Sequence, residues 1–277
     1  MDFNLTEVQQ DFMNLARDFG EKRLAPTIME RDHQGIYDDA LIAELLSLGI
    51  TGAYFEEKYG GAGDDGGDVL SYILAVEEMS KVDDGTGITL SASVSLCATP
   101  IYMFGTEEQK EKFLVPLVEG TKLGAFGLTE PNAGTDASGQ QTVAVKNDDG
   151  TYTLNGSKIF ITNGGAADIY IVFAMTDKSK GNHGITAFIL EDGMPGFTYG
   201  KKEDKMGIHT SVTMELVFQD VKVPAENMLG EEGKGFKIAM MTLDGGRIGV
   251  GAQALGIAEG AYNAALQYAK ERTQFGK

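Results

Sequence analysis

Residues 125–136 combine hydroxyl groups with glycines in a way that can hold a polar ligand. Thr129 and Thr135 supply the hydroxyls, while Gly127 and Gly134 allow close approach to the backbone. A loop of this composition can offer main-chain N–H groups and hydroxyls to a phosphate or to the polar edge of a ring. Taken alone, such a segment is more often an ordinary turn.

Residues 160–165 form a second such segment. Phe160 and Thr162 bring an aromatic ring and a hydroxyl to the end of an expected strand, and Gly164 and Gly165 then leave room for a flat ligand. This pattern is also weak by itself. Its interpretation depends on the elements that position it.

Those elements fall into three regions, predicted at residues 1–120, 121–228 and 229–277. The first region is predicted to be helical, because Thr6 and Gln9 have the spacing of a capping box and apolar residues then recur at helical intervals. Val69 is expected on the inward face of its helix. Further helices are expected at residues 38–48, 68–81 and 88–104, the last being apolar nearly all round.

The middle region is predicted to consist of short strands and tight turns. Asp149-Gly150 and Asn155-Gly156 are both hairpin signals. Strands are expected at residues 142–145, 152–154, 158–161, 169–175, 185–190 and 214–218. Short strands without alternating helices predict a compact barrel or sandwich, not a doubly wound nucleotide-binding fold.

The last region is predicted to be helical again, with segments at residues 236–243 and 248–270. Its many small residues permit close helix packing. An apolar helix of this kind needs partner helices, so we expect these residues to be the first part of a helical domain that continues beyond Lys277.

The net charge of −18 limits the partners of the chain. Nucleic acids and anionic membranes would be repelled at long range, although local groups can still hold a small anion. Solubility alone would explain the same charge. No stretch is expected to reach the ~20 apolar residues of a membrane span.

Cys97 is the only cysteine, so an internal disulfide is excluded and a reducing compartment is expected. It lies in a run of small residues and is interpreted as a buried, unreactive thiol. His33, His183 and His209 lie in separate regions, so no metal site is predicted. Without a targeting segment, a bacterial cytoplasm is favoured.

Taken together and in this order, the motifs resemble the acyl-CoA dehydrogenase family. The resemblance runs across all 277 residues and is carried by Thr129-Glu130-Pro131, Ile161-Thr162-Asn163-Gly164-Gly165, residues 243–249 (Leu-Asp-Gly-Gly-Arg-Ile-Gly) and residues 272–276 (Arg-Thr-Gln-Phe-Gly). Residues 201–208 and 235–240 look most like the short-chain, butyryl-CoA branch.

The resemblance implies an FAD-dependent enzyme that converts butyryl-CoA to crotonyl-CoA, or the reverse. It implies an α+β chain with an N-terminal helical domain, a central β-barrel and the start of a C-terminal helical bundle. A homotetramer is implied, with electron-transferring flavoprotein as the partner that exchanges electrons with the flavin.

The resemblance also implies roles for individual residues. Thr129 would bond the pyrimidine edge of the flavin and Thr162 would lie near flavin N5. Arg272 and Phe275 would reach the adenine half of the flavin on a neighbouring subunit. The flavin-lining set is Phe126, Leu128, Thr129, Gly134, Thr135, Phe160, Ile161 and Thr162, and the acyl-CoA set is Thr135, Asp244 and Arg247.

Several of these roles have plainer alternatives. Asp244 and Arg247 are three residues apart on a helix, so a surface ion pair explains them equally well. Arg272 can be a simple charge at a helix end, and Ser211 either touches ligand or is a solvated loop serine. Phe160 stands where the family commonly has Trp, which keeps an aromatic face and loses the indole N–H.

No catalytic residue is assigned. In most of the family the base is a glutamate late in the C-terminal domain, at a place expected beyond Lys277. In one branch the base lies immediately before the helix arginine, where this chain has Gly246. The chain as given is therefore expected to bind flavin weakly and to be inactive, whereas its parent is active.

Two other functions remain open from the sequence. An acyl-CoA oxidase uses the same scaffold and passes its electrons to oxygen. A non-catalytic interaction module would keep the barrel for docking a partner.

Overall fold

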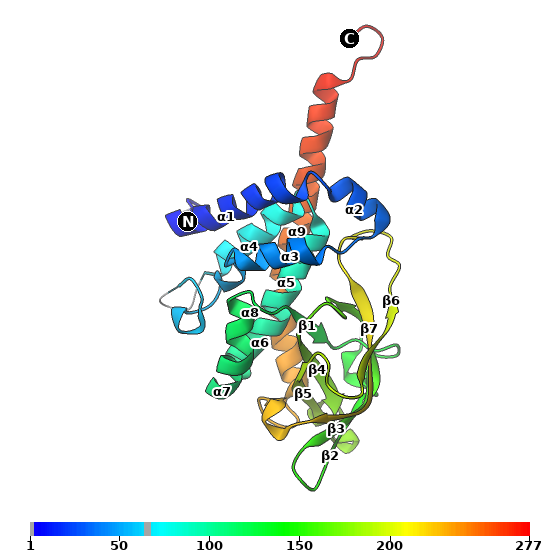
Figure 1. Ribbon diagram of the computed structural model, residues 1–277. Helices are drawn as coiled ribbons and strands as arrows, with labels where there is room; N and C mark the ends of the chain where they lie inside the picture. The colour runs from blue at the N-terminus through cyan, green and yellow to red at the C-terminus, as the bar shows by residue number, and fades with distance from the viewer. Residues whose placement is uncertain (1–2, 64–67) are drawn as a thin grey trace.

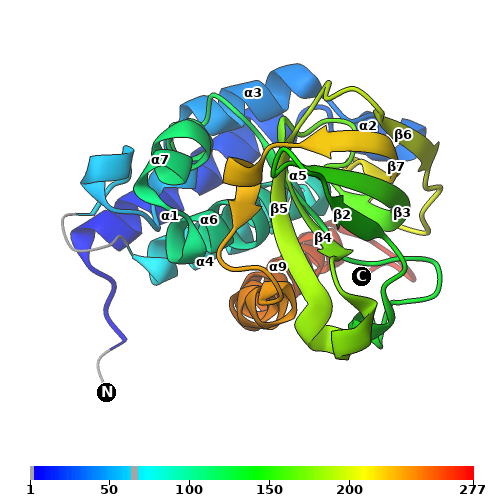
Figure 2. The same cartoon turned by 90° about the horizontal axis from the view of Figure 1, so that it is seen from below.

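The molecule consists of a group of helices packed beside a curled sheet (Figure 1). The structure, a computed structural model, describes residues 3–63 and 68–277. The long helix α9 (Gly235–Glu271) passes along both parts and projects beyond them, so that the C-terminus lies at its tip. Figure 2 shows α9 end-on where the helices and the sheet meet. The predicted fold class is confirmed.

Local sequence signals set the starts of the N-terminal helices. The predicted capping box is present, since Thr6 Oγ1 accepts from Gln9 N at 3.3 Å and Gln9 Oε1 accepts from Thr6 N at 2.9 Å.

In chain order the elements are α1 (Glu7–Phe19), η1 (Gly20–Leu24), α2 (Ile28–Gln34), α3 (Asp39–Ser47), η2 (Ile50–Gly52), η3 (Glu57–Tyr59), α4 (Val69–Ser80), α5 (Asp84–Ser91), η4 (Ala92–Ala98), α6 (Thr99–Phe104), α7 (Glu107–Gln109), η5 (Lys110–Leu114) and α8 (Val115–Val118).

The strands form one mixed sheet of eight, in the order β6-β7-β3-β2-β4-β5-β8, with β1 pairing parallel to β4. The strands are β1 (Gly124–Gly127), β2 (Val143–Lys146), β3 (Tyr152–Thr162), β4 (Ile169–Met175), β5 (Ile185–Glu191), β6 (Phe197–Lys202), β7 (Thr213–Val223) and β8 (Met228–Leu229). Short 3-10 turns lie between them at η6 (Ala137–Gly139), η7 (Lys178–Gly184) and η8 (Ala225–Asn227).

The apolar run of β4 is buried on both of its faces. Ile169, Ile171 and Phe173 pack into the core that the helices build. Tyr170 and Val172 pack into a second core enclosed by the curled sheet. Because a strand alternates its side chains between two faces, only a continuous apolar run can serve two cores at once.

The break predicted within the strand region at Asn155-Gly156 is wrong. Asn155-Gly156 is not a hairpin, because β3 continues through it and pairs with β7 on both sides of a register shift. Gly156 has a φ of 146° and lies so close to Thr142 that a Cβ there would be 2.5 Å from Thr142 Oγ1. The glycine is therefore needed for a bulge and a close approach within one strand.

The two helical segments predicted in the last region are a single helix, α9. Its glycines let α9 approach neighbouring segments closely, and this packing stabilises the helix through them. A Cβ on Gly249 would be 2.6 Å from Tyr72 Oη, and one on Gly256 would be 2.3 Å from the Glu77 carbonyl oxygen of α4. Close packing outweighs the low helix propensity of glycine here.

Two smaller expectations are also wrong. Val69 is 45% exposed, because it begins α4 at the first turn, away from the core. Asp84–Phe104 is apolar and long enough, by composition, to cross a membrane, with a mean hydropathy of 1.4 over its best window. Since 72% of that window is buried inside the protein, the segment is accounted for as a core helix.

Candidate functional site

A cavity of about 340 Å³ lies where the sheet, η4 and α9 meet. All eight residues expected to line a flavin surround it, although they come from segments on either side of β2. The lining residues are Ala92, Leu96, Phe126, Leu128, Thr129, Gly134, Thr135, Ala137, Phe160, Ile161, Thr162, Met240, Leu243 and Arg247. The fold thus brings both motif segments to one place.

The loop after β1 forms one wall of the cavity. Phe126 at the end of β1 packs edge-on against Phe173, with ring centroids 5.0 Å apart. Beyond it, the Leu128 carbonyl accepts from Lys158 Nζ at 3.1 Å and the Thr129 carbonyl accepts from Ile159 N at 2.8 Å. Both carbonyls are therefore directed toward β3.

The end of β3 forms the opposing wall. The pairing of β3 with β7 shifts register between Lys158 and Ile161, and at this bulge Phe160 has a φ of 59°. The residue is 60% exposed, which is unusual for so large an apolar side chain. A left-handed φ on a bulky residue is strained, and such strain is common at binding sites.

Asn163 fastens this wall to the rest of the molecule. Its side-chain amide donates to the carbonyls of Thr89 in α5 and Gly124 in β1, both at 3.0 Å, and its main-chain amide donates to Val212 at 3.0 Å. The residue is fully buried, and its φ of 64° is one that Asn tolerates better than most residues. It locks the position of the neighbouring Thr162.

The cavity offers hydrogen-bond donors that the protein does not use itself. Within residues 3–63 and 68–277, neither the main-chain amide nor the hydroxyl of Thr129 or of Thr135 has a partner. Unpaired donors beside an exposed aromatic ring suit a flat ring with polar edges and a phosphate-bearing tail. The residues present therefore fit FAD.

The α9 side of the cavity carries a charge pair. Arg247 Nη1 lies 2.6 Å from Asp244 Oδ1, and the two side chains are 71% and 72% exposed. The surface ion pair considered from the sequence thus exists. Arg247 also lines the cavity, whereas Asp244 does not.

The remaining predicted residues lie elsewhere. Arg272 and Phe275 follow the end of α9 and are exposed, and neither lines the cavity. Their expected contact with the flavin of another subunit stays a prediction.

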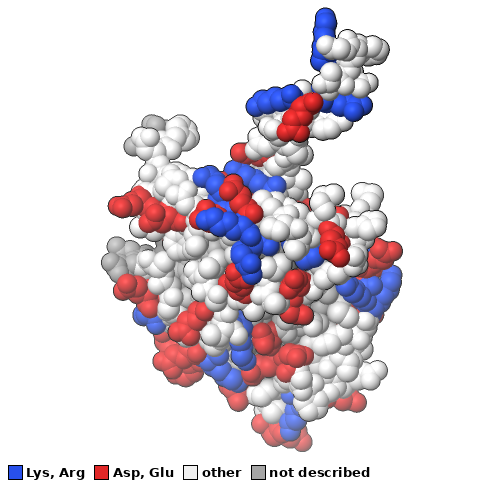
Figure 3. Space-filling model, turned by 45° about the horizontal axis from the view of Figure 1, so that its top comes forward, with Lys and Arg blue, Asp and Glu red and all other residues white. Residues whose placement is uncertain are grey.

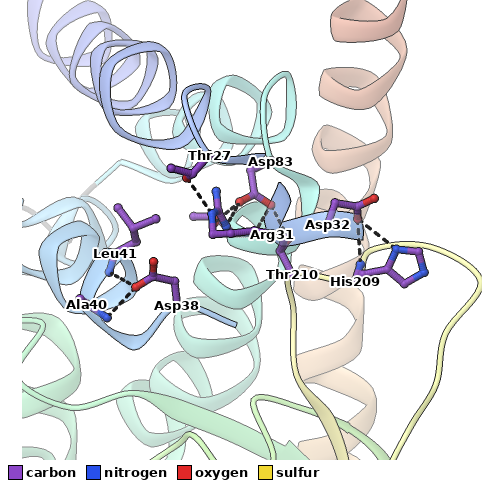
Figure 4. A network of polar contacts seen from close by, with 10 residues as sticks. Thr27, Arg31, Asp32, Asp38, Ala40, Leu41, Asp83, His209 and Thr210 are labelled. Carbon is purple, nitrogen blue, oxygen red and sulfur yellow. Dashed lines mark hydrogen bonds and ion pairs between the residues drawn. The ribbon is translucent and has the colours of Figure 1, made fainter. Parts of the chain in front are cut away.

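Ser211 is not a solvated serine, because it is only 1% exposed and its hydroxyl is buried without a partner among the described residues. The turn that carries it is held by the network in Figure 4. Asp83 accepts from Thr210 Oγ1 at 2.5 Å and from Arg31 Nη1 at 2.8 Å, and His209 Nδ1 lies 3.1 Å from Asp32 Oδ1. This network joins α2, α5 and the β6–β7 loop.

Lys158 was not predicted from the sequence as part of the site. This residue is fully buried, and its amine lies 2.7 Å from Glu130 Oε1. Burial lowers the pKa of Lys158 to about 8, although Glu130 opposes the shift. Burial also raises the pKa of Glu130, but the amine of Lys158 outweighs it and holds that pKa below its usual value. The available signal was a lysine in phase with the inward-facing Tyr152 and Leu154 of β3.

No carboxylate, imidazole or thiol lines this cavity in the part of the chain that the structure describes. Cys97, the only cysteine in the sequence, is a fully buried residue of η4, and burial raises its pKa to about 12. Its predicted burial is confirmed. The cavity walls can therefore bind and orient a ligand but supply no group that removes a proton from carbon.

Surface charge is mixed around these features. Figure 3 shows acidic side chains spread over one face of the molecule with basic ones between them. On the face drawn, acidic and basic groups are thus interspersed, and Arg247 is the one cationic side chain among the described residues that line the cavity.

Three family models match consecutive parts of the chain. They are "Acyl-CoA dehydrogenase, N-terminal domain" over residues 6–121, "Acyl-CoA dehydrogenase, middle domain" over residues 125–221 and "Acyl-CoA dehydrogenase, C-terminal domain" over residues 233–277.

Individual proteins agree with these models. "Acyl-CoA dehydrogenase, short-chain specific" of Megasphaera elsdenii is 86% identical over 277 residues, which are 100% of this chain and 72% of that protein. The solved structure of butyryl-CoA dehydrogenase from Megasphaera elsdenii has a TM-score of 0.98 at 86% identity, with the same coverage of 100% and 72%. A chain in a structure described as electron transferring flavoprotein of Acidaminococcus fermentans has a TM-score of 0.97 at 70% identity, again covering 100% and 72%.

Proposed function

Because the chain belongs to the acyl-CoA dehydrogenase family, we propose that its cavity holds the flavin ring of FAD and the thioester end of a short-chain acyl-CoA. The reaction is the α,β-dehydrogenation of butyryl-CoA to crotonyl-CoA, or its reverse. The observation that carries the substrate class is the 86% identity to a short-chain enzyme along the whole chain. FAD is the cofactor of this enzyme, and when bound it accepts the hydride that leaves the β-carbon.

The chain's own residues hold that cofactor. Thr129 and Thr135 offer free amide and hydroxyl donors to its polar groups, and Phe160 presents its ring face. Thr162, fixed through Asn163, is assigned to the neighbourhood of flavin N5. Free donors with no internal partner are available without breaking an existing hydrogen bond, which favours binding.

Apolar side chains exclude water from the reacting carbons. Leu96, Met240 and Leu243 form a wall of the cavity from η4 and α9. The α-proton of a thioester is a weak acid, so removal requires hydrogen bonds that stabilise the developing enolate oxygen, and these are stronger where water is excluded. No wall residue in the part of the chain that the structure describes can accept the proton, so the base is not one of these lining residues.

Arg247 is proposed to hold the acyl-CoA together with Asp244 and Thr135. Its guanidinium is 71% exposed at the cavity and keeps donors beyond the one that Asp244 accepts. A guanidinium recognises phosphate or carbonyl oxygens directionally. On a chain with a net charge of −18, this local cation is what admits an anionic CoA ester.

The partners follow from the relatives. Electron-transferring flavoprotein exchanges electrons with the reduced flavin, in keeping with the 70% identical chain of the Acidaminococcus fermentans structure. A homotetramer is proposed because it is typical of the family to which the chain and its 86% identical relative belong. The bacterial relatives support a bacterial cytoplasm as the compartment.

The test uses the full-length protein loaded with FAD. Anaerobic addition of butyryl-CoA should bleach the flavin absorbance and form crotonyl-CoA, and electron-transferring flavoprotein should restore turnover. Rapid oxygen uptake without that partner would identify an oxidase instead. Unchanged flavin absorbance with butyryl-CoA would leave only a binding module and overturn the proposal.

A further inference from the structure

Lys158 occupies an inward position of β3, where a charged side chain is costly. Its amine has no exposed surface and three acceptors within reach. Lys158 Nζ donates to Glu130 Oε1 at 2.7 Å, to Gln140 Oε1 at 3.0 Å and to the Leu128 carbonyl at 3.1 Å. Each of its three N–H groups is therefore used.

Glu130 extends this contact to a third segment. Its carboxylate accepts from the main-chain amides of Gln141 at 2.5 Å and Thr142 at 3.1 Å, just before β2. The Lys158–Glu130 pair thus joins the loop after β1, the middle of β3 and the approach to β2. Of the residues that the pair contacts, Leu128 lines the cavity.

The hydrogen bond to Leu128 sets the direction of the next amide. The Leu128 carbonyl and the Thr129 N–H belong to one planar trans peptide unit, so they point in opposite directions. Because Lys158 holds that carbonyl on the β3 side, the Thr129 N–H is turned away from β3. Thr129 lines the cavity, and its N–H has no partner among the described residues.

We propose that Lys158 is a positioning residue of the flavin site, which aims the Thr129 main-chain amide at the cofactor by holding the Leu128 carbonyl. This inference rests on the proposed placement of FAD in the cavity. Lys158 itself does not line the cavity and acts through the peptide unit.

A purely structural role would be served as well by an apolar residue. Replacing a buried ion pair by apolar groups of similar size is often neutral or stabilising. Such a replacement would fill the space in β3 but would leave the Leu128 carbonyl without its donor. Stability and flavin binding therefore separate in a suitable variant.

The experiment compares full-length variants as apoproteins titrated with FAD. The single variant Lys158→Met leaves Glu130 buried without its cation, so it is expected to lower both stability and FAD affinity. The double variant Lys158→Met/Glu130→Gln removes both charges, so that no unpaired ion is buried. We expect its thermal midpoint to lie above that of Lys158→Met, and its Kd for FAD to be raised about tenfold, as for loss of one oriented hydrogen bond. The visible spectrum of its bound flavin should also shift.

Arg31→Met is the matched control. It breaks an equally buried ion pair away from the cavity, and we expect a lower thermal midpoint with an unchanged Kd for FAD. Wild-type FAD affinity and an unshifted flavin spectrum in the double variant would overturn the inference, as would an equal loss of FAD affinity in Arg31→Met. If the wild type itself fails to bind FAD, the proposed function fails, and the inference fails with it.

Discussion

Two buried ion pairs hold two loops of this protein, and they differ in what lies next to them. Lys158–Glu130 joins β3 to the loop after β1, with side chains 0% and 4% exposed. Arg31–Asp83 joins α2 to α5, with side chains 6% and 0% exposed. In the first pair every amine N–H is accepted, whereas Arg31 Nη2 has no partner among the described residues.

The two buried ion pairs have different structural roles. Arg31–Asp83 fastens a turn of the β6–β7 loop through the side chain of Thr210. Lys158–Glu130 instead holds main-chain groups directly, namely the carbonyl of Leu128, which lines the cavity, and the amides of Gln141 and Thr142. Similar burial therefore does not imply a similar role, and the neighbouring backbone decides which pair affects cofactor binding.

The largest expected effect is on stability in Lys158→Met. Glu130 would remain buried with two main-chain donors but no cation, and breaking a buried pair in this way costs about 3–5 kcal/mol. Chemical unfolding of the full-length protein measures the change. If Lys158→Met lowers the free energy of unfolding by less than Arg31→Met does, the comparison is contradicted, because Arg31–Asp83 would then be the more important pair for stability.

Arg31→Met should cost less, about 2–3 kcal/mol. Asp83 would still accept from Thr86 N, Thr86 Oγ1 and Thr210 Oγ1, so its carboxylate keeps most of its hydrogen bonds. Unfolding under the same conditions gives the value. If Arg31→Met fails to unfold at lower denaturant than the wild type, the β6–β7 turn is held by other contacts.

The first pair should also be visible in the pH dependence of stability. Burial lowers the pKa of Lys158 to about 8 from 10.5, and Glu130 is the charged group within reach of its amine. Between these values the folded protein has released a proton that the unfolded chain still binds. Unfolding then takes up a proton, so the free energy of unfolding rises with pH, by at most about 1.4 kcal/mol per pH unit.

Thermal midpoints of the wild type and of Lys158→Met/Glu130→Gln between pH 7 and 10 measure this contribution. The thermal midpoint of the wild type should rise relative to that of the double variant from about pH 8 upward, as Lys158 deprotonates. Parallel curves over the whole range would show that the amine keeps an ordinary pKa.

The smallest expected effect on stability is that of Asp244→Ala. The Asp244–Arg247 pair is more than two-thirds exposed on each side, and exposed pairs contribute about 0–1 kcal/mol. If Asp244 nevertheless helps Arg247 to hold acyl-CoA, the variant should raise KM for butyryl-CoA in the full-length enzyme while the thermal midpoint stays constant. An unchanged KM would leave the pair as a surface feature only.

Sequence patterns predicted the elements whose signals are local. The capping box at Thr6 and the strand Ile169–Met175 were predicted to the residue, because backbone donors and two-sided burial leave direct marks on the sequence. Strand β3 was divided at Gly156 and α9 at its glycines, because the contacts that keep them continuous come from distant segments. Thr142 lies against Gly156 and Leu96 lies against Gly246, and the local sequence around either glycine does not reveal these neighbours.

The candidate site shows the same limit. The two motif segments were predicted to share one ligand, and the fold does bring them to one cavity. Lys158 was overlooked because a lysine is ordinarily solvated. Its burial is compensated by the ion pair with Glu130, which forms only in the folded structure. Its role depends on the direction of a peptide unit, which no side-chain pattern records.

The two faces of β4 also determine how the chain can fold. Ile169, Ile171 and Phe173 complete a core whose other members, such as Leu90 and Cys97, come from the N-terminal helices. The helical and sheet regions, although matched by separate family models, therefore share one apolar interior. The helical region therefore lacks a complete core without this face of β4, whereas the curled sheet also encloses a second core. Because the first core is shared, the two regions should unfold in a single cooperative calorimetric transition, and the helical region should resist expression as a separate piece.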